Sequence, residues 1–387
     1  MRTLYRNGAL ALATGPHLLT DHSLLVDGTR IAWLGPHDDL GDLEEDVRVV
    51  DAGGTSIVPG MVDSHSHTVL PGGSHWIARI GDPTDELLRV AEDNGASALA
   101  AGTRWLRDVG SPRRDGRALS LRVRDHWKDR RDRPYLRAAG SWVSRSGVLP
   151  PDISVEVEDS EKLTSAVLQQ IEEGADLVKL YLDGPDPDEA PWTVDELTRV
   201  VGAAHKQGLR VTAHATLLAG ARVGVEAGVD CIEHGSQLDG DVVAEMAIRG
   251  TFLVPTLAIY ESWAAFSSTT TIDRFTSEEG RARIASRRLD AHESLRVARA
   301  AGVRIAAGTD FGGGSLRANQ MAWEVECLVQ AGLEPWEALA AATWVGGDLL
   351  GEPTAGRLEQ GGPADSFLVH GNPLEDPRSL WRVWRLG

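Results

Sequence analysis

Apolar strand-like runs alternate with amphipathic helices from about residue 59 to residue 357 of this chain. Helices are predicted at residues 194–207, 219–227, 278–301 and 320–331. A glycine directly follows each of them, which is the usual stop at the end of a helix. Three of these glycines are followed by apolar runs, typical of parallel strands buried on both faces, at residues 209–213, 229–233 and 303–307. This alternation favours an α/β fold, a (β/α)8 barrel. A doubly wound open sheet is the alternative, but no Gly-x-Gly-x-x-Gly turn opens a helix.

The two ends of the chain have a different pattern, with short alternating runs separated by turns. Apolar runs on both sides of Asp27-Gly28 predict a hairpin. Strands are also expected at residues 364–369 and 380–384, around the turn at Gly371-Asn372-Pro373. We therefore expect residues 1–58 and 358–387 to form one small β domain and residues 59–357 to form the barrel. A chain of 387 residues is long enough for both.

Charge and composition exclude several classes of protein. The net charge of −18 argues against nucleic acid or anionic lipid as a partner. No run of about 18 uncharged apolar residues is present to span a membrane. The N-terminus lacks the apolar core of a secretion signal, and Cys231 and Cys327 lie in apolar contexts typical of reduced core residues. We expect a cytoplasmic protein whose partner is a small molecule, and assembly into a homo-oligomer stays open.

Two histidines one residue apart, His65 and His67, follow a short apolar run that is typical of a buried strand. Residues i and i+2 of a strand point to the same face, so both imidazoles are expected to face one place. A divalent metal ion needs such an arrangement. A single His-x-His pair is common by chance, so the prediction depends on the rest of the chain.

Four further side chains end or interrupt later apolar runs: Lys179, His214, His234 and Asp310. Taken alone, His214 fits a hydrogen-bonded core histidine and Asp310 fits a helix N-cap. In a barrel, however, functional groups gather where the strands end, at the C-terminal mouth. Together with His65 and His67, these side chains are therefore predicted to form a ligand set for two metal ions.

Lys179 is unusual because it interrupts the apolar run 177–182, whereas the other lysines lie in polar surroundings. A charged amine in such a strand is costly unless it is paired or neutralised. One interpretation is an ion pair with an acidic neighbour such as Asp183. The other is carboxylation of the amine by CO2, because the resulting carbamate can bridge two cations. Burial favours carboxylation, since it lowers the pKa of the amine and supplies the neutral nucleophile.

Several motifs together resemble the amidohydrolase superfamily, nearest the branch of Xaa-Pro dipeptidases and imidazolonepropionases. They are residues 58–67, Arg107-Asp108-Val109-Gly110, residues 228–235, Val254-Pro255-Thr256-Leu257, Gly308-Thr309-Asp310 and Gly371-Asn372-Pro373-Leu374. The resemblance covers almost the whole chain. It implies a barrel with a β-sandwich domain and a binuclear centre, most often of zinc.

The same resemblance implies a role for each predicted ligand. His65 and His67 would bind the first metal ion with Asp310, and His214 and His234 would bind the second. Lys179, carboxylated, would bridge the two ions. The implied reaction is metal-assisted hydrolysis of a C–N bond, with Asp310 as the general acid–base that moves a proton from water to the leaving nitrogen.

The chain departs from the dipeptidase pattern in two places that concern the substrate. The branch usually has Gly-Gly-His-Gly after strand three, where this chain has residues 142–147, and often His-Ala-His-Gly at strand five, where it has residues 214–217. Arg145 stands where a substrate-facing histidine is expected, and its guanidinium is predicted to pair with a substrate carboxylate unless it lies on a solvated loop. Tyr181 and Tyr260 are predicted to line the substrate pocket, with packing at the barrel rim as the alternative.

Three other functions compete with a C–N hydrolase. An aminohydrolase that releases ammonia usually has a single metal ion and a glutamate near strand five. Lys179, and the lack of a His-x-x-Glu motif after Ala213, count against it. Lactone or organophosphate hydrolysis uses the same kind of site and stays open. A scaffold that has lost catalysis would usually lack ligands, and here the set is complete.

Overall fold

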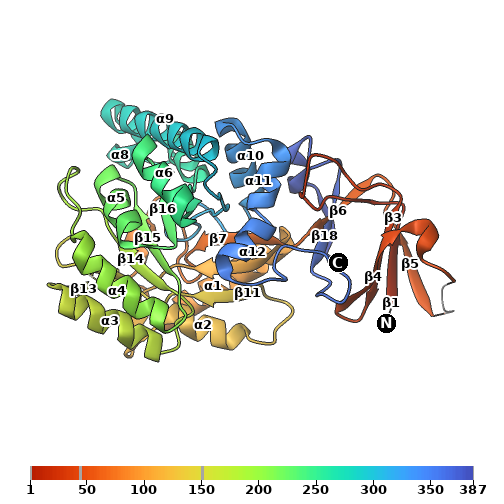
Figure 1. Cartoon of the computed structure of the whole chain (residues 1–387), viewed down its shortest axis with the longest axis horizontal. Coiled ribbons are helices and arrows are strands. Elements are labelled where there is room, and N and C mark those ends of the chain that lie inside the picture. Colours follow the sequence, from red (N-terminus) through yellow and green to blue (C-terminus); the bar gives the residue numbers. More distant parts are fainter. Residues whose placement is uncertain (1, 43–45, 150–151, 387) are drawn as a thin grey trace.

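The computed structural model describes residues 2–42, 46–149 and 152–386 (Figure 1). The central strands run parallel, and β13 (Ser154–Val157) lies at an edge beside β12. Their hydrogen-bonded order is β7-β8-β11 in one sheet and β13-β12-β14-β15-β16-β17 in the other. The central strands are β7 (Met61–Ser66), β8 (Thr103–Asp108), β11 (Tyr135–Ala138), β12 (Trp142–Arg145), β14 (Val178–Tyr181), β15 (Val211–Ala215), β16 (Cys231–His234) and β17 (Phe252–Val254).

Backbone contacts on both sides close these two sheets into a ring. The amide of Asp176, just before β14, donates to the carbonyl of Ala138 in β11 at 2.9 Å. On the other side, residues 303–308 lie beside β17 through a parallel bridge at Ile305. Ser64 of β7 donates a 2.9 Å hydrogen bond to the same segment. The predicted α/β barrel is therefore confirmed in outline.

Helices cover the outside of this ring (Figure 1). The predicted helices at 194–207, 219–227, 278–301 and 320–331 are present, each differing from the prediction by one residue at one end. The helices are α1 (Thr84–Ala100), α2 (Leu119–Trp127), α3 (Ser160–Glu172), α4 (Val194–Lys206), α5 (Leu218–Ala227), α6 (Gly240–Arg249), α7 (Ala258–Phe266), α8 (Asp273–Thr276), α9 (Glu278–Ala300), α10 (Met321–Ala331), α11 (Pro335–Ala341) and α12 (Trp344–Leu350).

The strands after three of these helices differ from the prediction. β15 and β16 begin two residues later than the predicted runs at 209 and 229. The reason is visible after α4, where Gly208 has a left-handed φ of 77° and Leu209 donates back to the carbonyl of Ala204 at 3.1 Å. The first residue after the glycine thus belongs to the helix cap rather than to the strand. The run at 303–307 forms only a single bridge and is not a regular strand.

The two ends of the chain meet in two four-stranded sheets, of order β4-β3-β1-β5 and β19-β18-β6-β2. The hairpin predicted around Asp27-Gly28 is confirmed by antiparallel pairing of β3 and β4. Residues 380 and 381 lie in a short 3-10 helix instead of the predicted strand, because Asp376 caps that turn. The strands are β1 (Arg2–Arg6), β2 (Ala9–Leu10), β3 (His22–Asp27), β4 (Arg30–Pro36), β5 (Val47–Asp51), β6 (Thr55–Pro59), β18 (Ser366–His370) and β19 (Val383–Leu386).

Both terminal sheets contribute to one buried apolar cluster, which includes Leu24 and Ile31 from the first and Ile57 and Leu368 from the second. The two sheets lie beside the barrel, on the right in Figure 1. Within the described residues, no helix has the length and apolar character needed to cross a membrane. Cys231 and Cys327 are buried free thiols.

Candidate metal centre

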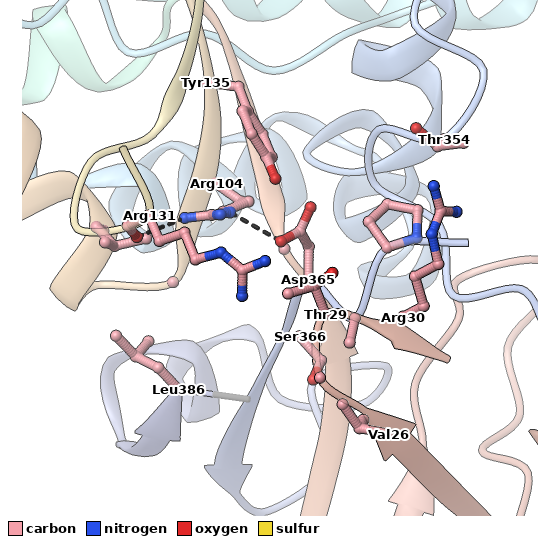
Figure 2. Close-up of a pocket in the computed structure, with 16 residues that line it drawn as sticks. Val26, Thr29, Arg30, Arg104, Arg131, Tyr135, Thr354, Asp365, Ser366 and Leu386 are labelled. Carbon is pink, nitrogen blue, oxygen red and sulfur yellow. Dashed lines mark hydrogen bonds and ion pairs between the residues drawn. The ribbon is translucent and has the colours of Figure 1, made fainter. Parts of the chain in front are cut away.

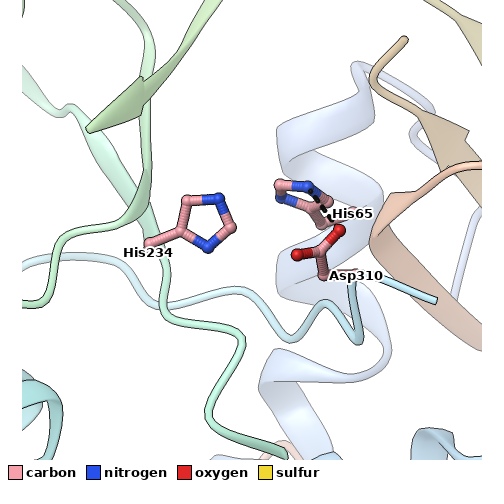
Figure 3. Close-up of side chains that lie close together, drawn as sticks. All are labelled: His65, His234 and Asp310. Carbon is pink, nitrogen blue, oxygen red and sulfur yellow. Dashed lines mark ion pairs between the residues drawn. The ribbon is translucent and has the colours of Figure 1, made fainter. Parts of the chain in front are cut away.

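The predicted ligands lie at the C-terminal ends of different barrel strands. His65 belongs to β7, His214 to β15, and His234 is the last residue of β16. His67 directly follows β7, and Asp310 follows the segment 303–308, which lies beside β17 through one bridge. Figure 3 shows His65, His234 and Asp310 facing one another from three separate segments. One potential ligand atom from each of these three buried residues lies within 4.8 Å of the others.

His67 and His214 complete this group of side chains. The Nε2 atoms of His65 and His67 lie 3.3 and 3.2 Å from Oδ1 of Asp310. The His214 and His234 rings are 4.5 Å apart between centroids, and the His65 and His234 rings are 5.0 Å apart. The structure therefore brings the four predicted histidines and the aspartate close together, with His65, His234 and Asp310 around one point.

The backbone turns sharply at the ends of the last three strands. His234, Thr256 and Asp310 have left-handed φ values of 70°, 49° and 55°. Non-glycine residues rarely adopt this conformation, and a β-branched threonine is especially disfavoured. Strain of this kind concentrates at functional sites, where the surrounding structure holds it in place.

Hydrogen bonds behind the imidazoles fix which ring nitrogen faces the centre. Nδ1 of His67 lies 2.7 Å from the carbonyl of Gly110, and Nδ1 of His234 lies 2.8 Å from Oγ1 of Thr256. Outer-shell partners of this type orient metal-binding histidines. Burial lowers the pKa of His65 and of His234 well below the usual value, so both rings are neutral, the form that binds a metal.

Gly313 is required for His67 to sit where it does. A Cβ atom on Gly313 would lie 2.0 Å from Cδ2 of His67, closer than any real contact. The bare backbone of the loop after Asp310 therefore makes room for the imidazole.

Lys179 lies in the barrel interior beneath these groups, and its side chain is fully buried. Its Nζ forms an ion pair with Oε2 of Glu233. The other oxygen of Glu233 accepts hydrogen bonds from Arg107 at 3.0 Å and from Thr212 at 2.7 Å. Asp183, the partner suggested by the ion-pair interpretation, is not that partner. It lies 3.2 Å from Nε2 of His214 and accepts hydrogen bonds from Thr216.

Within this interior group, Nζ of Lys179 and Oε2 of Glu233 contact each other as an ion pair. Nδ1 of His65 is buried and makes no hydrogen bond among the described residues. Oε2 of Glu233 lies 3.4 Å from Nδ1 of His65, so these atoms face the same region. Burial, and secondarily the charge of Arg107, lower the pKa of Lys179 to about 7. The donor set of imidazoles and carboxylates fits divalent metal ions.

The residues predicted to contact substrate occupy three different environments. The ring of Tyr181 stacks on His214 with centroids 4.1 Å apart. The Tyr260 hydroxyl, on α7, hydrogen-bonds Oγ of Ser236 at 2.5 Å, and burial raises its pKa. Arg145 ends β12 with an exposed side chain, donates to the carbonyl of Pro191 at 2.6 Å and lies over the ring of Trp192. Substrate binding by these three residues stays a prediction.

Sequence reasoning missed the roles of Glu233 and Arg107. Both are charged residues inside apolar strands, the same signal that singled out Lys179. Asp108, at the end of β8, was also missed. It accepts hydrogen bonds from the amide and hydroxyl of Thr68 at 2.7 and 2.6 Å and so anchors the segment after His67.

Replacing Arg107 with methionine is expected to lower the free energy of unfolding by about 3–5 kcal/mol, because it removes one partner of a buried ion pair and leaves Oε1 of Glu233 with only the Thr212 hydroxyl. Arg107 is 3% exposed and holds Glu233 from the side opposite Lys179. Urea denaturation measures the change. The matched control is Arg283→Met on the exposed face of α9, where a change within about 0.5 kcal/mol is expected. Equal losses of unfolding free energy for the two substitutions would show that the interior ion pair stabilises the fold no more than an exposed one.

Comparison with known proteins places the chain in a family. The model of the amidohydrolase family matches residues 56–384, and the chain belongs to this family. An uncharacterised protein of Mycobacterium tuberculosis is 34% identical over 328 residues, which are 84% of this chain and 81% of that protein. Imidazolonepropionase of Paenarthrobacter aurescens is 27% identical over 91% of this chain and 87% of its own length.

A solved structure of a Xaa-Pro dipeptidase with bound methionine superposes with a TM-score of 0.86. It is 26% identical, and the match covers all of this chain and 98% of that one. These relatives confirm the resemblance to the Xaa-Pro dipeptidase and imidazolonepropionase branch and the TIM-barrel fold. The protein is a metal-dependent hydrolase of C–N bonds.

Proposed function

We propose that the protein cleaves an amide, a cyclic amide or an N-acyl amino acid or dipeptide at a centre of two zinc ions. His65, His67 and Asp310 would hold one ion, His214 and His234 would hold the other, and Lys179, once carboxylated, would supply a ligand to both. The observation that carries the proposal is the convergence of His65, His67, His234 and Asp310 on one point at the barrel mouth. Two such ions, when bound, lower the pKa of a water molecule and polarise the scissile carbonyl group.

Asp310 is placed to move the proton. Its Oδ1 lies between the Nε2 atoms of His65 and His67, at 3.3 and 3.2 Å. Burial raises the pKa of Asp310, but the interactions with these two imidazoles outweigh burial and hold the pKa well below its usual value. The carboxylate is therefore ionised at neutral pH, accepts the proton of the attacking water and passes it to the leaving nitrogen.

Lys179 is suited to carboxylation by its surroundings. Its pKa of about 7 leaves a substantial fraction of neutral amine at neutral pH. The amine nitrogen adds to CO2 and loses one proton, which gives a carbamate anion with two oxygen atoms. Lys179 and His214 lie on neighbouring strands. β14 pairs with β15, and the partner of His214 is Tyr181, two residues after Lys179. A carbamate there extends the side chain toward the histidines.

The test is a substrate screen combined with metal analysis. Purified protein is offered N-acyl amino acids, dipeptides, cyclic imides and lactones. Released amine is measured for the first two classes, and the ring-opened acid for the imides and lactones. We expect hydrolysis of a substrate from one of the first three classes, with about two metal ions per chain. Hydrolysis of lactones alone would identify the protein as a lactone hydrolase. Free ammonia as the product would identify it as an aminohydrolase.

Arg145 is proposed to bind a substrate carboxylate. Arg145→Ala is expected to raise KM for an acidic substrate about 10- to 100-fold, the effect of losing one hydrogen bond between charged groups. Steady-state kinetics measures this, with Arg199→Ala, an exposed arginine on α4, as the control. If KM does not change, Arg145 only packs against Trp192 and Pro191.

We also propose that residues 1–58 and 358–387 form one β-sandwich domain attached to a barrel of residues 59–357. The antiparallel pairing of β18 with β6, which joins the two ends of the chain, supports this division. So does the buried cluster shared by the two terminal sheets. A cytoplasmic location is proposed on the two free thiols, which fit a reducing compartment.

A further inference from the structure

A cavity of about 480 Å³ lies between the barrel and the terminal sheets. Its barrel side includes Arg104 of β8, Arg131 and Tyr135 of β11. The other side is formed by the turn between β3 and β4 and by Asp365 and Ser366 at the start of β18. Arg104 is near the beginning of β8, whereas Asp108 at its end lies beside the metal centre. The cavity is therefore at the opposite end of the barrel from that centre, and its volume falls within the range of about 300–1,000 Å³ typical of ligand sites.

Arg104 is fully engaged in holding this cavity together. Its Nε donates to Oδ1 of Asp365 at 2.8 Å, and its Nη1 donates to the carbonyl of Arg131 at 3.0 Å. Its guanidinium carbon lies 4.4 Å from the centroid of the Tyr135 ring. Arg104 thus joins the barrel to the terminal sheets and is a positioning residue.

Three polar groups of the cavity make no hydrogen bond within the described residues, although the charge of Arg131 acts on Asp365. Within the described residues, Oδ2 of Asp365 and Oγ of Ser366 are buried and make no hydrogen bond. Ser366 as a whole is 7% exposed. The guanidinium of Arg131 forms neither a hydrogen bond nor an ion pair with any described side chain, and it ends beside Asp365 in the view of Figure 2. One wall of the cavity therefore contains a buried acceptor without a hydrogen bond, and the neighbouring wall carries the exposed cation of Arg131.

We propose that this cavity binds a free α-amino acid, with its ammonium group on Asp365 and Ser366 and its carboxylate on Arg131. The pairing of an ammonium with a carboxylate and of a guanidinium with a carboxylate gives the strong, charge-assisted type of hydrogen bond. A simple anion such as phosphate fits poorly, because Oδ2 of Asp365 would repel it. A simple cation leaves Arg131 without a partner and is repelled by it.

The apolar part of the lining indicates which amino acids fit. Val26, Leu99, Tyr135 and Leu386 border the cavity, and Figure 2 shows Leu386, Tyr135 and Val26 around the charged centre. An aliphatic side chain can pack against these residues, so L-leucine is the probe of choice. The proposal does not rest on the proposed catalytic function, because no cavity residue belongs to the metal centre.

Isothermal titration calorimetry of the full chain tests the proposal with three ligands. L-leucine is expected to bind with a Kd of about 1 mM or below. Leucinamide lacks the carboxylate and N-acetyl-L-leucine lacks the ammonium, so each is expected to bind at least about tenfold more weakly. Absence of saturable leucine binding, or equal binding of all three ligands, overturns the proposal.

Variants locate the bound leucine. Arg131→Gln changes an exposed side chain and should fold normally, and it is expected to weaken leucine binding at least about tenfold. Ser366→Ala tests the opposite wall without breaking the ion pair of Arg104, and it is expected to weaken binding severalfold. Asp310→Asn at the metal centre is expected to leave the affinity unchanged. If Asp310→Asn abolishes binding while Arg131→Gln does not, leucine binds as a product at the catalytic centre and the cavity site is refuted.

Discussion

Replacing Asp310 with asparagine is expected to lower kcat by about 10²- to 10⁴-fold, the range that one general acid–base contributes. The amide keeps an oxygen where Oδ1 now faces His65 and His67, so the variant is expected to retain its metal ions. What it loses is the capacity to accept a proton from water and to protonate the leaving nitrogen. Steady-state kinetics and metal analysis on the same preparation measure the two effects separately.

The matched control is Asp188→Asn, which makes the same chemical change on an exposed loop before α4. Its kcat is expected to equal that of the unmodified protein. An Asp310→Asn variant that turns over at nearly the normal rate would remove Asp310 from the chemistry. If metal and activity are lost together, Asp310 acts as a ligand without a separate role in proton transfer.

Replacing Lys179 with alanine is the second change with a large expected effect. Metal content should fall from about two ions per chain to one or fewer, because the proposed bridge is lost. Since a metal ion supplies several kcal/mol of transition-state stabilisation, kcat is expected to fall about 10³-fold or more. Folding should persist, because Glu233 keeps its contacts with Arg107 and Thr212.

A rescue experiment separates a bridging carbamate from a simple ion pair. The alanine variant has space where the lysine side chain was, and added formate or acetate supplies a carboxylate of similar chemistry. Partial recovery of metal content and activity is expected with these anions and not with chloride at the same ionic strength. Recovery with chloride too, or activity in the alanine variant without any additive, would mean that Lys179 serves only to neutralise Glu233.

The sequence was sufficient to predict the barrel and four of its helices, because apolar periodicity and terminal glycines report directly on those elements. The clustering of the predicted histidines and Asp310 was also predictable, since a charged or imidazole side chain at the end of an apolar strand is conspicuous. His65, His67, His214, His234 and Asp310 indeed lie together. That clustering is what the pattern predicts, and their roles as ligands stay proposals.

The partner of Lys179 could not be read from the sequence. Asp183 is close along the chain, but it lies beyond the end of β14, where it meets His214 and Thr216. Glu233 is distant in sequence, yet the strand register places it across the barrel interior beside Lys179. Side chains that point into a closed barrel meet across it, and only the three-dimensional register reveals those pairs.

The left-handed backbone at His234 and Asp310 was not predicted, because histidine and aspartate, although enriched among non-glycine residues in this conformation, adopt it rarely. The segment 303–307 was expected to be a regular strand and forms one bridge instead. Its departure from a regular ladder immediately precedes the turn that presents Asp310. Prediction of the backbone from local sequence therefore failed at the residues where the chain adopts the strained geometry of the site.

Crystallography of the zinc-loaded protein, with anomalous scattering measured at the zinc edge, tests the central claim most directly. We predict two anomalous peaks about 3.5–4 Å apart at the barrel mouth. One should touch His65, His67 and Asp310, the other His214 and His234, with density for a carbamate on Lys179 between them. A single peak with Lys179 still paired to Glu233, or no peak at the mouth, would contradict the two-metal centre.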